Sequence, residues 1–482
     1  MSSYRPEAPP NTTKTRTVFT IDNFSSTSKL AENIGSTNTI NEKDELYNPF
    51  DERNVEHPNS DAGALLHLLK SSLGTGILAM PMAFTYGGFT FSIIGTLITG
   101  LICTHCVHIL VKSSHDLCKR AKRPSLTFAE TAEVAFEYGP LGVRKLASFA
   151  RIFVNTALVL TYFGGNSVYV YFISKSTQEV VQYYKGDEKT FVLEVYMVLL
   201  LIVLIPLCQI RVLKWLVPFS GVANVLMFGA ITITLYYLFK DGVTSPNERP
   251  QVGPITDWPL FFCTVIFAME GIGVIMPVEN SMRNPQRFLG CPGILNISMS
   301  IVLSLYTLMG IFGYLKYGTI KEPITSEIPI DEVPGQMARI FIAVAITFTY
   351  ALQYFVPMDI IWSSMKQSIP KSYRNIAQIS MRSLAVIATV VIAAVVNNLE
   401  SLIGLVGAIC FSILGLMVPC IVEIVTCWDA KAFGIGYWKL IKDIIILLFA
   451  MMTLVSGSYS SIENLINPGN PETLANRYFV WT

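Results

Sequence analysis

Charged residues are scarce in this chain of 482 residues: Asp, Glu, Lys and Arg make up 14% of it, hydrophobic residues make up 52%, and the mean hydropathy is +0.49. A soluble domain carries about 25% charged residues, so this chain has too few charged residues to cover the surface of a soluble protein of 482 residues. The scarcity excludes disordered, collagen-like and small disulfide-rich classes. It predicts an integral membrane protein embedded in a lipid bilayer. A formal net charge of +1 gives no electrostatic footprint for nucleic acid.

Motifs for catalysis and metal binding are missing as well. No HExxH, Walker A or G-x-S-x-G pattern occurs, and acidic residues are scattered rather than paired, so we expect neither an enzyme nor a bound metal or cofactor. Cys103, His105, Cys106 and His108 lie close along the chain. However, 100° per residue puts the two cysteines and the two histidines on nearly opposite faces of one helix. The nine cysteines are interpreted as small core residues or free thiols.

The first 60 residues lack any sustained apolar run and are rich in Ser, Thr and Asn. We expect residues 1–60 to be a disordered cytoplasmic tail without a cleavable signal peptide. Within it, Tyr47-Asn48-Pro49-Phe50 is similar to tyrosine-based endocytic and lysosomal sorting signals. A trafficking adaptor is therefore a candidate partner, and an inert tail is the alternative.

From residue 61 to 482, long uncharged stretches alternate with short charged loops, which predicts a transmembrane transporter domain. The 41 residues between Lys70 and Lys112 carry no charge; they exceed one crossing of roughly 20 residues, so residues 86–88 are taken as a turn between two helices. Counted in this way, the runs predict eleven transmembrane helices. The excess of Lys and Arg in alternate loops places the N-terminus in the cytoplasm. Residues 125–137 are predicted to form a short interfacial helix.

Two of the predicted helices are interrupted by small residues. The first, LLHLLKSSLGTGILAMP at 65–81, holds Ser71, Ser72, Gly74, Thr75 and Gly76 in its middle. The sixth, IFAMEGIGVIMPVEN at 266–280, holds Glu270, Gly271, Ile272 and Gly273. Four predicted helices separate the breaks, which indicates two five-helix halves that each begin with a broken helix, plus one extra helix. This pattern is typical of inverted-repeat secondary transporters; the alternative is that each glycine cluster is only a close helix contact.

Broken helices suit a zwitterionic ligand. The half-helix after a break presents unpaired N–H groups and a positive dipole end to a carboxylate, and the carbonyls before the break can face an ammonium group. An α-amino acid has both groups. The predicted substrate-binding residues are Ser71, Ser72, Gly74, Thr75, Gly76, Gly271, Ile272 and Gly273, joined by Thr349 and Tyr350 of the eighth predicted helix. Because Glu270 is the only charge at the breaks, small neutral amino acids are favoured.

Two ionisable residues near the breaks are candidates for proton coupling. His67 lies in an apolar stretch, and a histidine with an ordinary pKa near 6.5 changes charge in a mild acid gradient. Glu270 lies at the second break, where an ionisable residue within a membrane is a functional candidate by default. The alternatives are a packing histidine and a glutamate that bonds the unwound backbone.

The stretches 65–81, THCVHILV (104–111), EGIGVIMPVEN (270–280) and FTYALQYFVP (348–357) together resemble the proton-coupled amino acid transporter family of the amino acid/auxin permease superfamily, over roughly residues 60–460. The resemblance implies an eleven-helix fold of the leucine-transporter type. It also implies symport of protons with glycine, alanine or proline at a plasma or lysosomal membrane. His67 matches the histidine that this family uses in proton coupling. Two alternatives stay open: an amino-acid sensor in nutrient signalling, and a sodium-coupled or exchange transporter of the same fold.

Overall fold

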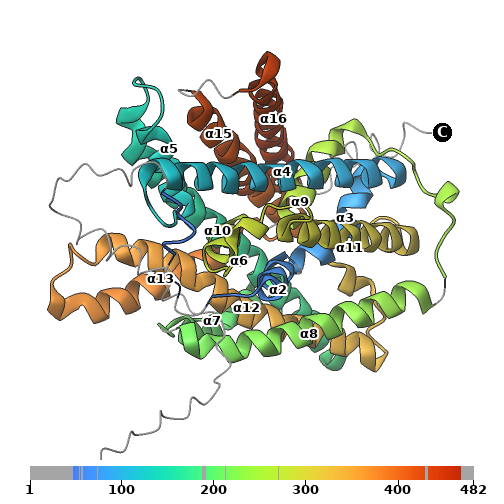
Figure 1. Cartoon of the computed structure of the whole chain (residues 1–482). Coiled ribbons are helices and arrows are strands. Elements are labelled where there is room, and N and C mark those ends of the chain that lie inside the picture. Colours follow the sequence, from blue (N-terminus) through green and yellow to red (C-terminus); the bar gives the residue numbers. More distant parts are fainter. Residues whose placement is uncertain are drawn as a thin grey trace, which may run out of the picture.

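The computed structural model describes residues 47–53, 55, 58–72, 74–186, 191–211, 213–240, 242–269, 271–428 and 433–467. Regular structure within these ranges is helical (Figure 1). The principal helices are α2 (Asp61–Ser72), α3 (Thr75–Gly87), α4 (Phe89–Ala121), α5 (Phe128–Glu137), α6 (Ala147–Lys185), α7 (Leu193–Cys208), α8 (Leu213–Lys240), α9 (Trp258–Ala268), α10 (Ile272–Asn280), α11 (Ile294–Tyr317), α12 (Val333–Met365), α13 (Arg374–Val396), α14 (Leu399–Leu405), η9 (Val406–Met417), α15 (Val418–Trp428) and α16 (Trp438–Ile466).

The lengths and apolar composition of these helices suit a membrane. In the described part of the chain, nine spans are long and apolar enough to cross one, and the pair α2 and α3, bent by 50°, would be a tenth. Helix α7 is apolar but has only 16 residues. Each of the eleven predicted segments coincides with one of these helices or helix groups, which confirms an all-helical membrane fold; the number eleven stays a prediction. The short helix expected at 125–137 is α5, which Thr127 and Glu130 cap reciprocally.

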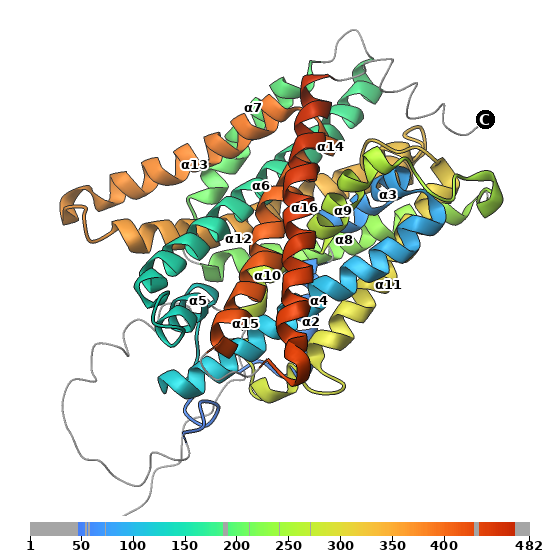
Figure 2. The same ribbon diagram turned by 90° about the horizontal axis from the view of Figure 1, so that it is seen from above.

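Helices at corresponding places in the two halves pack against each other. The broken pair α2–α3 meets the broken pair α9–α10, and α4, α6 and α7 meet α11, α12 and α13 in turn. Contacts between the third and fifth segments also recur. The third segment of the first half, α6, packs on η9 in the fifth segment of the second half, and the third segment of the second half, α12, packs on α8, the fifth segment of the first. Each half has five segments, an odd number, so the second half runs in the opposite direction. The chain therefore folds as a five-plus-five inverted repeat, and α16 is the additional helix, lying against α9, α14 and η9 (Figure 2).

The chain contacts this bundle from Tyr47 onward, ahead of the predicted domain boundary at residue 60. Pro49 is buried. The amide of Asn59 donates to the carbonyl of Ser281 (2.8 Å), and the amide of Arg283 donates to the carbonyl of Asn59 (2.9 Å). We refer to residues 47–53, 55 and 58–60 as the N-terminal strap. Residues 1–46 of the predicted tail lie outside the described residues.

Helix η9 is π-helical over 12 residues, a conformation that is uncommon and is frequent at functional sites. It packs on α9, α6 and α16. At Gly407 a Cβ atom would lie 2.1 Å from the carbonyl oxygen of Cys263 in α9. The two backbones therefore approach each other with no side chain between them. This contact positions η9 against α9, the helix that ends at the second break.

Replacing Gly407 with Ala should lower the melting temperature of the detergent-solubilised protein, because the added methyl group meets backbone that cannot turn aside; overpacking of this kind costs about 1–3 kcal/mol. The temperature is measured from the peak height in size-exclusion chromatography after heating. The control is Gly221→Ala on α8, where a Cβ meets no atom within 4 Å and which should melt at or above the wild-type temperature. A wild-type melting temperature for Gly407→Ala would contradict the close approach of η9 and α9.

Candidate functional site

The helix breaks fall where the small residues predict them. Helix α2 ends at Ser72 and α3 begins at Thr75. Helix α9 ends at Ala268 and α10 begins at Ile272. Between α9 and α10, Gly271 has φ +148°, a conformation that favours glycine because a Cβ atom would be strained there. Glu270, one of the two predicted proton-coupling residues, lies outside the described residues.

The two breaks touch each other through glycine positions. A Cβ on Gly76 would lie 2.8 Å from the Cα and the carbonyl oxygen of Ala268, so these backbones are in direct contact. Gly271 faces the first break, since its Cβ would lie 3.4 Å from Oγ of Ser72. Gly273 packs under a tyrosine of α6, with the hydroxyl of Tyr162 only 2.4 Å from where its Cβ would be. The sequence therefore needs glycine here for close approach as well as for helix breaking.

Hydrogen bonds hold the first break in shape. The hydroxyl of Tyr306 in α11 donates to the carbonyl of Ser72, and the amide of Gly74 donates to the same oxygen (2.9 Å). The hydroxyl of Ser71 donates back to the carbonyl of Leu68 (3.0 Å). Thr75, at the start of α3, is buried, and its hydroxyl has no hydrogen-bond partner among the residues that the structure describes. This polar atom is available to a ligand at the break.

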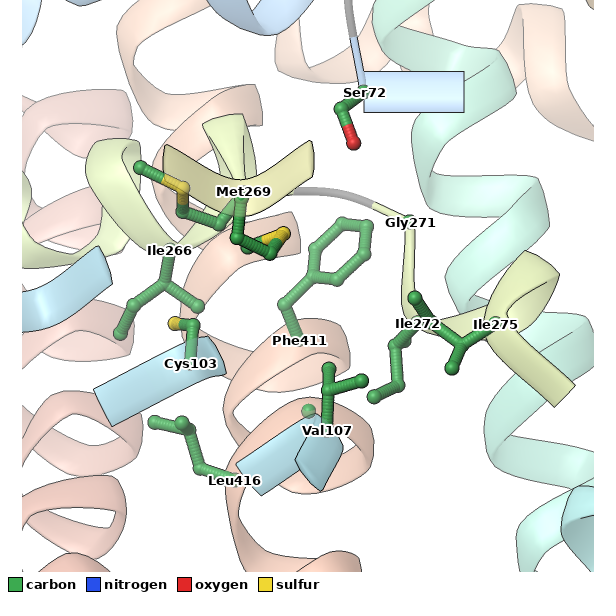
Figure 3. A pocket seen from close by; sticks show the side chains of 12 residues that line it. Ser72, Cys103, Val107, Ile266, Met269, Gly271, Ile272, Ile275, Phe411 and Leu416 are labelled. Atoms are coloured by element: carbon green, nitrogen blue, oxygen red, sulfur yellow. The ribbon is translucent and has the colours of Figure 1, made fainter. Parts of the chain in front are cut away.

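A cavity of about 30 Å³ lies beside the two breaks, with room for about two water molecules. In Figure 3 the side chain of Ser72 points toward it, with Gly271 alongside. The walls come from α2, α4, the α9–α10 break, α11 and η9, and carry no charged side chain. The lining residues are Ser72, Cys103, Val107, Ile266, Met269, Gly271, Ile272, Ile275, Met299, Phe411, Gly415 and Leu416.

The ends of α2, α9 and α10 line this cavity, and two residues separate the start of α3 from the end of α2. The N-terminal ends of α3 and α10 carry partial positive charge, and the C-terminal ends of α2 and α9 carry partial negative charge. The first N–H groups and the last carbonyls of a helix have no partner within it. The arrangement thus offers donors and acceptors without any ionised side chain, which is suited to a small ligand that carries both charges.

His67 and Lys70 both lie on α2, before the first break. His67 is half-buried on α2, one turn before Ser71. Lys70, on the same helix, donates to the hydroxyl of Ser220 in α8. This contact ties α2 to the fifth segment of the first half.

Thr349 and Tyr350 in α12 use their hydroxyls elsewhere. Thr349 bonds the carbonyl of Ala345 on its own helix (2.9 Å). Tyr350 is fully buried, and its hydroxyl lies 2.7 Å from that of Thr389 in α13. Neither lines the cavity, so their contribution to substrate binding stays a prediction.

An ion pair closes the other end of α10. Glu279 is fully buried, and its Oε1 lies 2.9 Å from Nη1 of Arg53 in the N-terminal strap and 2.7 Å from Nε2 of His115 in α4. Arg53 is itself only 5% exposed and donates to the carbonyl of Pro124 (2.8 Å). The ring of Phe50 packs edge-on against His115, with centroids 5.0 Å apart. The strap therefore ties α10, α4 and the start of α5 together.

Sequence reasoning did not find Arg53, Tyr306 or Phe411. Arg53 and Glu279 are 226 residues apart, and Arg53 belongs to a segment that composition alone assigns to the tail. Tyr306 and Phe411 are aromatic residues in apolar runs, where most aromatics only pack. For Phe411, one sequence signal was available: Gly407 and Gly415 lie four residues before and after it in the tenth predicted helix, which indicates a close helix contact there.

Comparisons with known proteins give the family of the chain. The profile of the family "transmembrane amino acid transporter protein" matches residues 57–463. The proton-coupled amino acid transporter-like protein pathetic of Drosophila melanogaster is 41% identical over 87% of this chain and 88% of its own length. Vacuolar amino acid transporter 4 of Saccharomyces cerevisiae is 27% identical over 82% of this chain and 57% of its own length.

Solved structures give more distant matches. Mhp1, a nucleobase-cation-symport-1 family transporter, has a TM-score of 0.47 in its closed conformation, with 13% identity over 92% of this chain and 98% of that one. Its inward-facing conformation has a TM-score of 0.45, with 12% identity over 89% and 96%. The family profile covers most of the chain, and the family is one of membrane transporters rather than enzymes. The chain belongs to the transmembrane amino acid transporter family.

Proposed function

We propose that this protein is a secondary active transporter that carries small neutral amino acids, of the glycine, alanine and proline type, together with protons. The observation that carries the proposal is the convergence of two half-helix breaks on one small cavity. Membership of an amino acid transporter family supports the substrate class. The name of the Drosophila relative, 41% identical, supports proton coupling.

The size and polarity of the cavity favour the substrate class. Ligand pockets for drug-sized molecules usually measure about 300–1,000 Å³, whereas this cavity is about 30 Å³. The walls therefore have to move apart to admit even a small amino acid, and a larger one would need a larger displacement. Ile272, Ile275 and Phe411 line it with apolar atoms. A short apolar side chain is suited to these walls, and a charged side chain would lose its water without gaining a partner there. The amino and carboxylate groups of the substrate would bind the helix ends at the two breaks.

Protons are the proposed driving ion, and His67 is the proposed coupling residue among those described. It lies on the half-helix α2 that carries Ser71 and Ser72 to the break. Gain of a proton at His67 would change the charge of that half-helix directly. A difference of one pH unit supplies about 1.4 kcal/mol, and 100 mV adds about 2.3 kcal/mol per charge. Glu270 stays a second candidate from the sequence.

The N-terminal strap is the proposed gate at the C-terminal end of α10. Movement of α10 away from α4 would have to break the contacts of Glu279 with Arg53 and His115. Losing one partner of a buried ion pair costs about 3–5 kcal/mol, so opening requires the strap to move as well. With the N-terminus in the cytoplasm, as the positive loops predict, this gate faces the cytoplasm.

The proposed location is an endolysosomal or plasma membrane. The yeast relative is named a vacuolar transporter, which favours an acidic compartment as the proton source. The sorting signal at Tyr47 to Phe50 lies in the strap, where Pro49 is buried and burial raises the pKa of Tyr47 to about 12. An adaptor would therefore bind this segment only after the strap leaves the bundle.

Purified protein in liposomes should accumulate glycine, alanine or proline when an inward proton gradient is imposed with all sodium replaced by choline. His67→Ala should abolish this accumulation yet keep exchange of internal for external amino acid, because exchange moves no net proton. Radiolabelled uptake and counterflow measure the two processes. Leu66→Ala, at a position 66% exposed on the same helix, is the matched control and should behave as the wild type.

Three results would contradict parts of this proposal. Uptake that needs sodium would favour the sodium-coupled alternative. Amino acid binding without uptake or exchange would favour a sensor. Proton-driven accumulation by His67→Ala at the wild-type rate and pH dependence would exclude His67 as the coupling residue.

Gly273→Ala should lower alanine counterflow by about tenfold, equivalent to ~1.4 kcal/mol, because the new methyl group meets the hydroxyl of Tyr162. Removing that hydroxyl in the double variant Gly273→Ala/Tyr162→Phe should restore part of the rate, since the nearest ring atom is 3.0 Å away. Equal defects in the single and double variants would refute this contact as the cause.

Arg53→Ala should increase the labelling of Cys118 by a polar maleimide several-fold, since this thiol is fully buried in α4 close to the strap. Peptide-resolved mass spectrometry measures the modification. Arg287→Ala is the control, because its ion pair with Asp61 is exposed and should not affect the strap. Unchanged labelling of Cys118 in Arg53→Ala would mean that Arg53 does not hold the strap closed.

A further inference from the structure

A second group of buried ionisable residues lies where α4, α15 and α16 meet, outside the cavity and the strap. Nζ of Lys442 donates to Oε2 of Glu423 (2.7 Å) and lies 3.1 Å from Oδ1 of Asp443. The side chains of Glu423 and Asp443 are 9% and 1% exposed. We refer to Glu423, Lys442 and Asp443 as the carboxyl cluster. It lies near the loop that joins α15 to α16.

The charges of the carboxyl cluster do not balance if both acids are ionised. There are two carboxyl groups and one ammonium group, and a buried charge without a partner is strongly unfavourable. Oδ2 of Asp443 is buried and receives no hydrogen bond from the described residues. The carboxyl groups of Asp443 and Glu423 both contact the same ammonium group, that of Lys442, which brings them close together. One proton shared between them both neutralises the excess charge and supplies the missing bond.

Other titratable and charged groups surround the cluster. They are His105, Cys106, His108, Lys112 and Arg120 on α4, Cys420 and Cys427 on α15, and Lys439 on α16. Arg120 donates to the carbonyl of Thr426 (2.9 Å) rather than to a carboxylate. The rings of His105 and His108 are stacked 6.5 Å apart and half-buried. Imidazoles are the groups in this set that ordinarily titrate near neutral pH.

We propose that the carboxyl cluster is a proton-binding site, in which one proton is held between Glu423 and Asp443 beside Lys442, with His105 and His108 as the neighbouring groups that exchange it with water. Binding the proton changes the charge of the three side chains from net negative to neutral; no bond other than that to the proton forms or breaks. This goes beyond the proposed function, because a proton can bind here whether or not His67 couples transport.

The site is joined to the cavity by the helices that carry it. On α4, Cys103 and Val107 line the cavity. His105 and His108 lie on the opposite face of the same helix, which packs on α15. On the other side, Leu416 at the end of η9 lines the cavity, and the helix continues directly into α15 and Glu423. A change in the repulsion between Glu423 and Asp443 would shift α15 and α16 relative to α4, and with them two walls of the cavity.

Infrared spectroscopy of the reconstituted protein tests the proton directly, because a protonated carboxyl group has a C=O stretching band that a carboxylate lacks. At neutral pH the wild type should show such a band, and Asp443→Asn and Glu423→Gln should each lose it. Glu279→Gln is the control: Glu279 is equally buried but lies beside Arg53 and His115, so it is ionised and its loss should remove no band. If neither cluster variant loses a band, the carboxyl cluster holds no proton.

Counterflow at varied pH on the side of the cluster tests its effect on the cavity. The wild-type rate should change with this pH, and Asp443→Asn, which resembles the protonated form, should flatten the profile. Leu66→Ala, at an exposed position, is the control and should keep the wild-type profile. All variants in this test retain His67, so a failure of His67 in the accumulation assay is distinguishable from a failure of this site. If Asp443→Asn does not fold, Glu423→Gln serves in its place. A wild-type profile in the folded cluster variant would overturn the link between the cluster and the cavity.

Discussion

Direct backbone contact between the two helix breaks is the constraint on which the site depends. The missing side chain of Gly76 lets α3, the half-helix after the break in one repeat, lie against the carbonyl of Ala268 in the other. Because α3 and α9 are fixed by this contact, the ends of α2, α9 and α10 come together at one cavity, and two residues separate the start of α3 from the end of α2. Any side chain at Gly76 would separate them and leave the polar backbone groups without a common ligand.

The inverted repeat makes this contact possible and also makes it asymmetric. Both breaks use small residues, but the first is closed by a tyrosine from α11, through Tyr306 and Ser72, and the second by a tyrosine from α6, through Tyr162 and Gly273. The walls that α4 and η9 supply to the cavity are apolar. The backbone of the two repeats is thus related by a two-fold axis, but the side chains around the site differ from one side of the cavity to the other.

How far the sequence determines these features depends on how local they are. The breaks, the helix segments and the repeat could be predicted, because uncharged length and glycine clusters are read along the chain itself. The opposite faces of Cys103 and His105 also followed from 100° per residue. The partners could not be predicted: Glu423 and Asp443 belong to different helices, and Arg53 meets Glu279 across 226 residues. Glu270, the only charged residue at the predicted breaks, falls outside the described residues, so its role in proton coupling stays a prediction.

Because charged residues are scarce in this chain, the few that are buried have few partners, and the balance of charge around each determines whether it is ionised. Glu279 has a guanidinium and an imidazole as partners for one carboxyl group, whereas the carboxyl cluster has one ammonium for two carboxyl groups. The first arrangement holds a carboxylate ionised and therefore needs the strap in place; the second is neutral only with an added proton. Helix α10 is nine residues long and carries Ile272 at the cavity and Glu279 at the strap. A displacement of its first turn by a ligand is therefore transmitted to the ion pair at its other end, because so short a helix moves as one body.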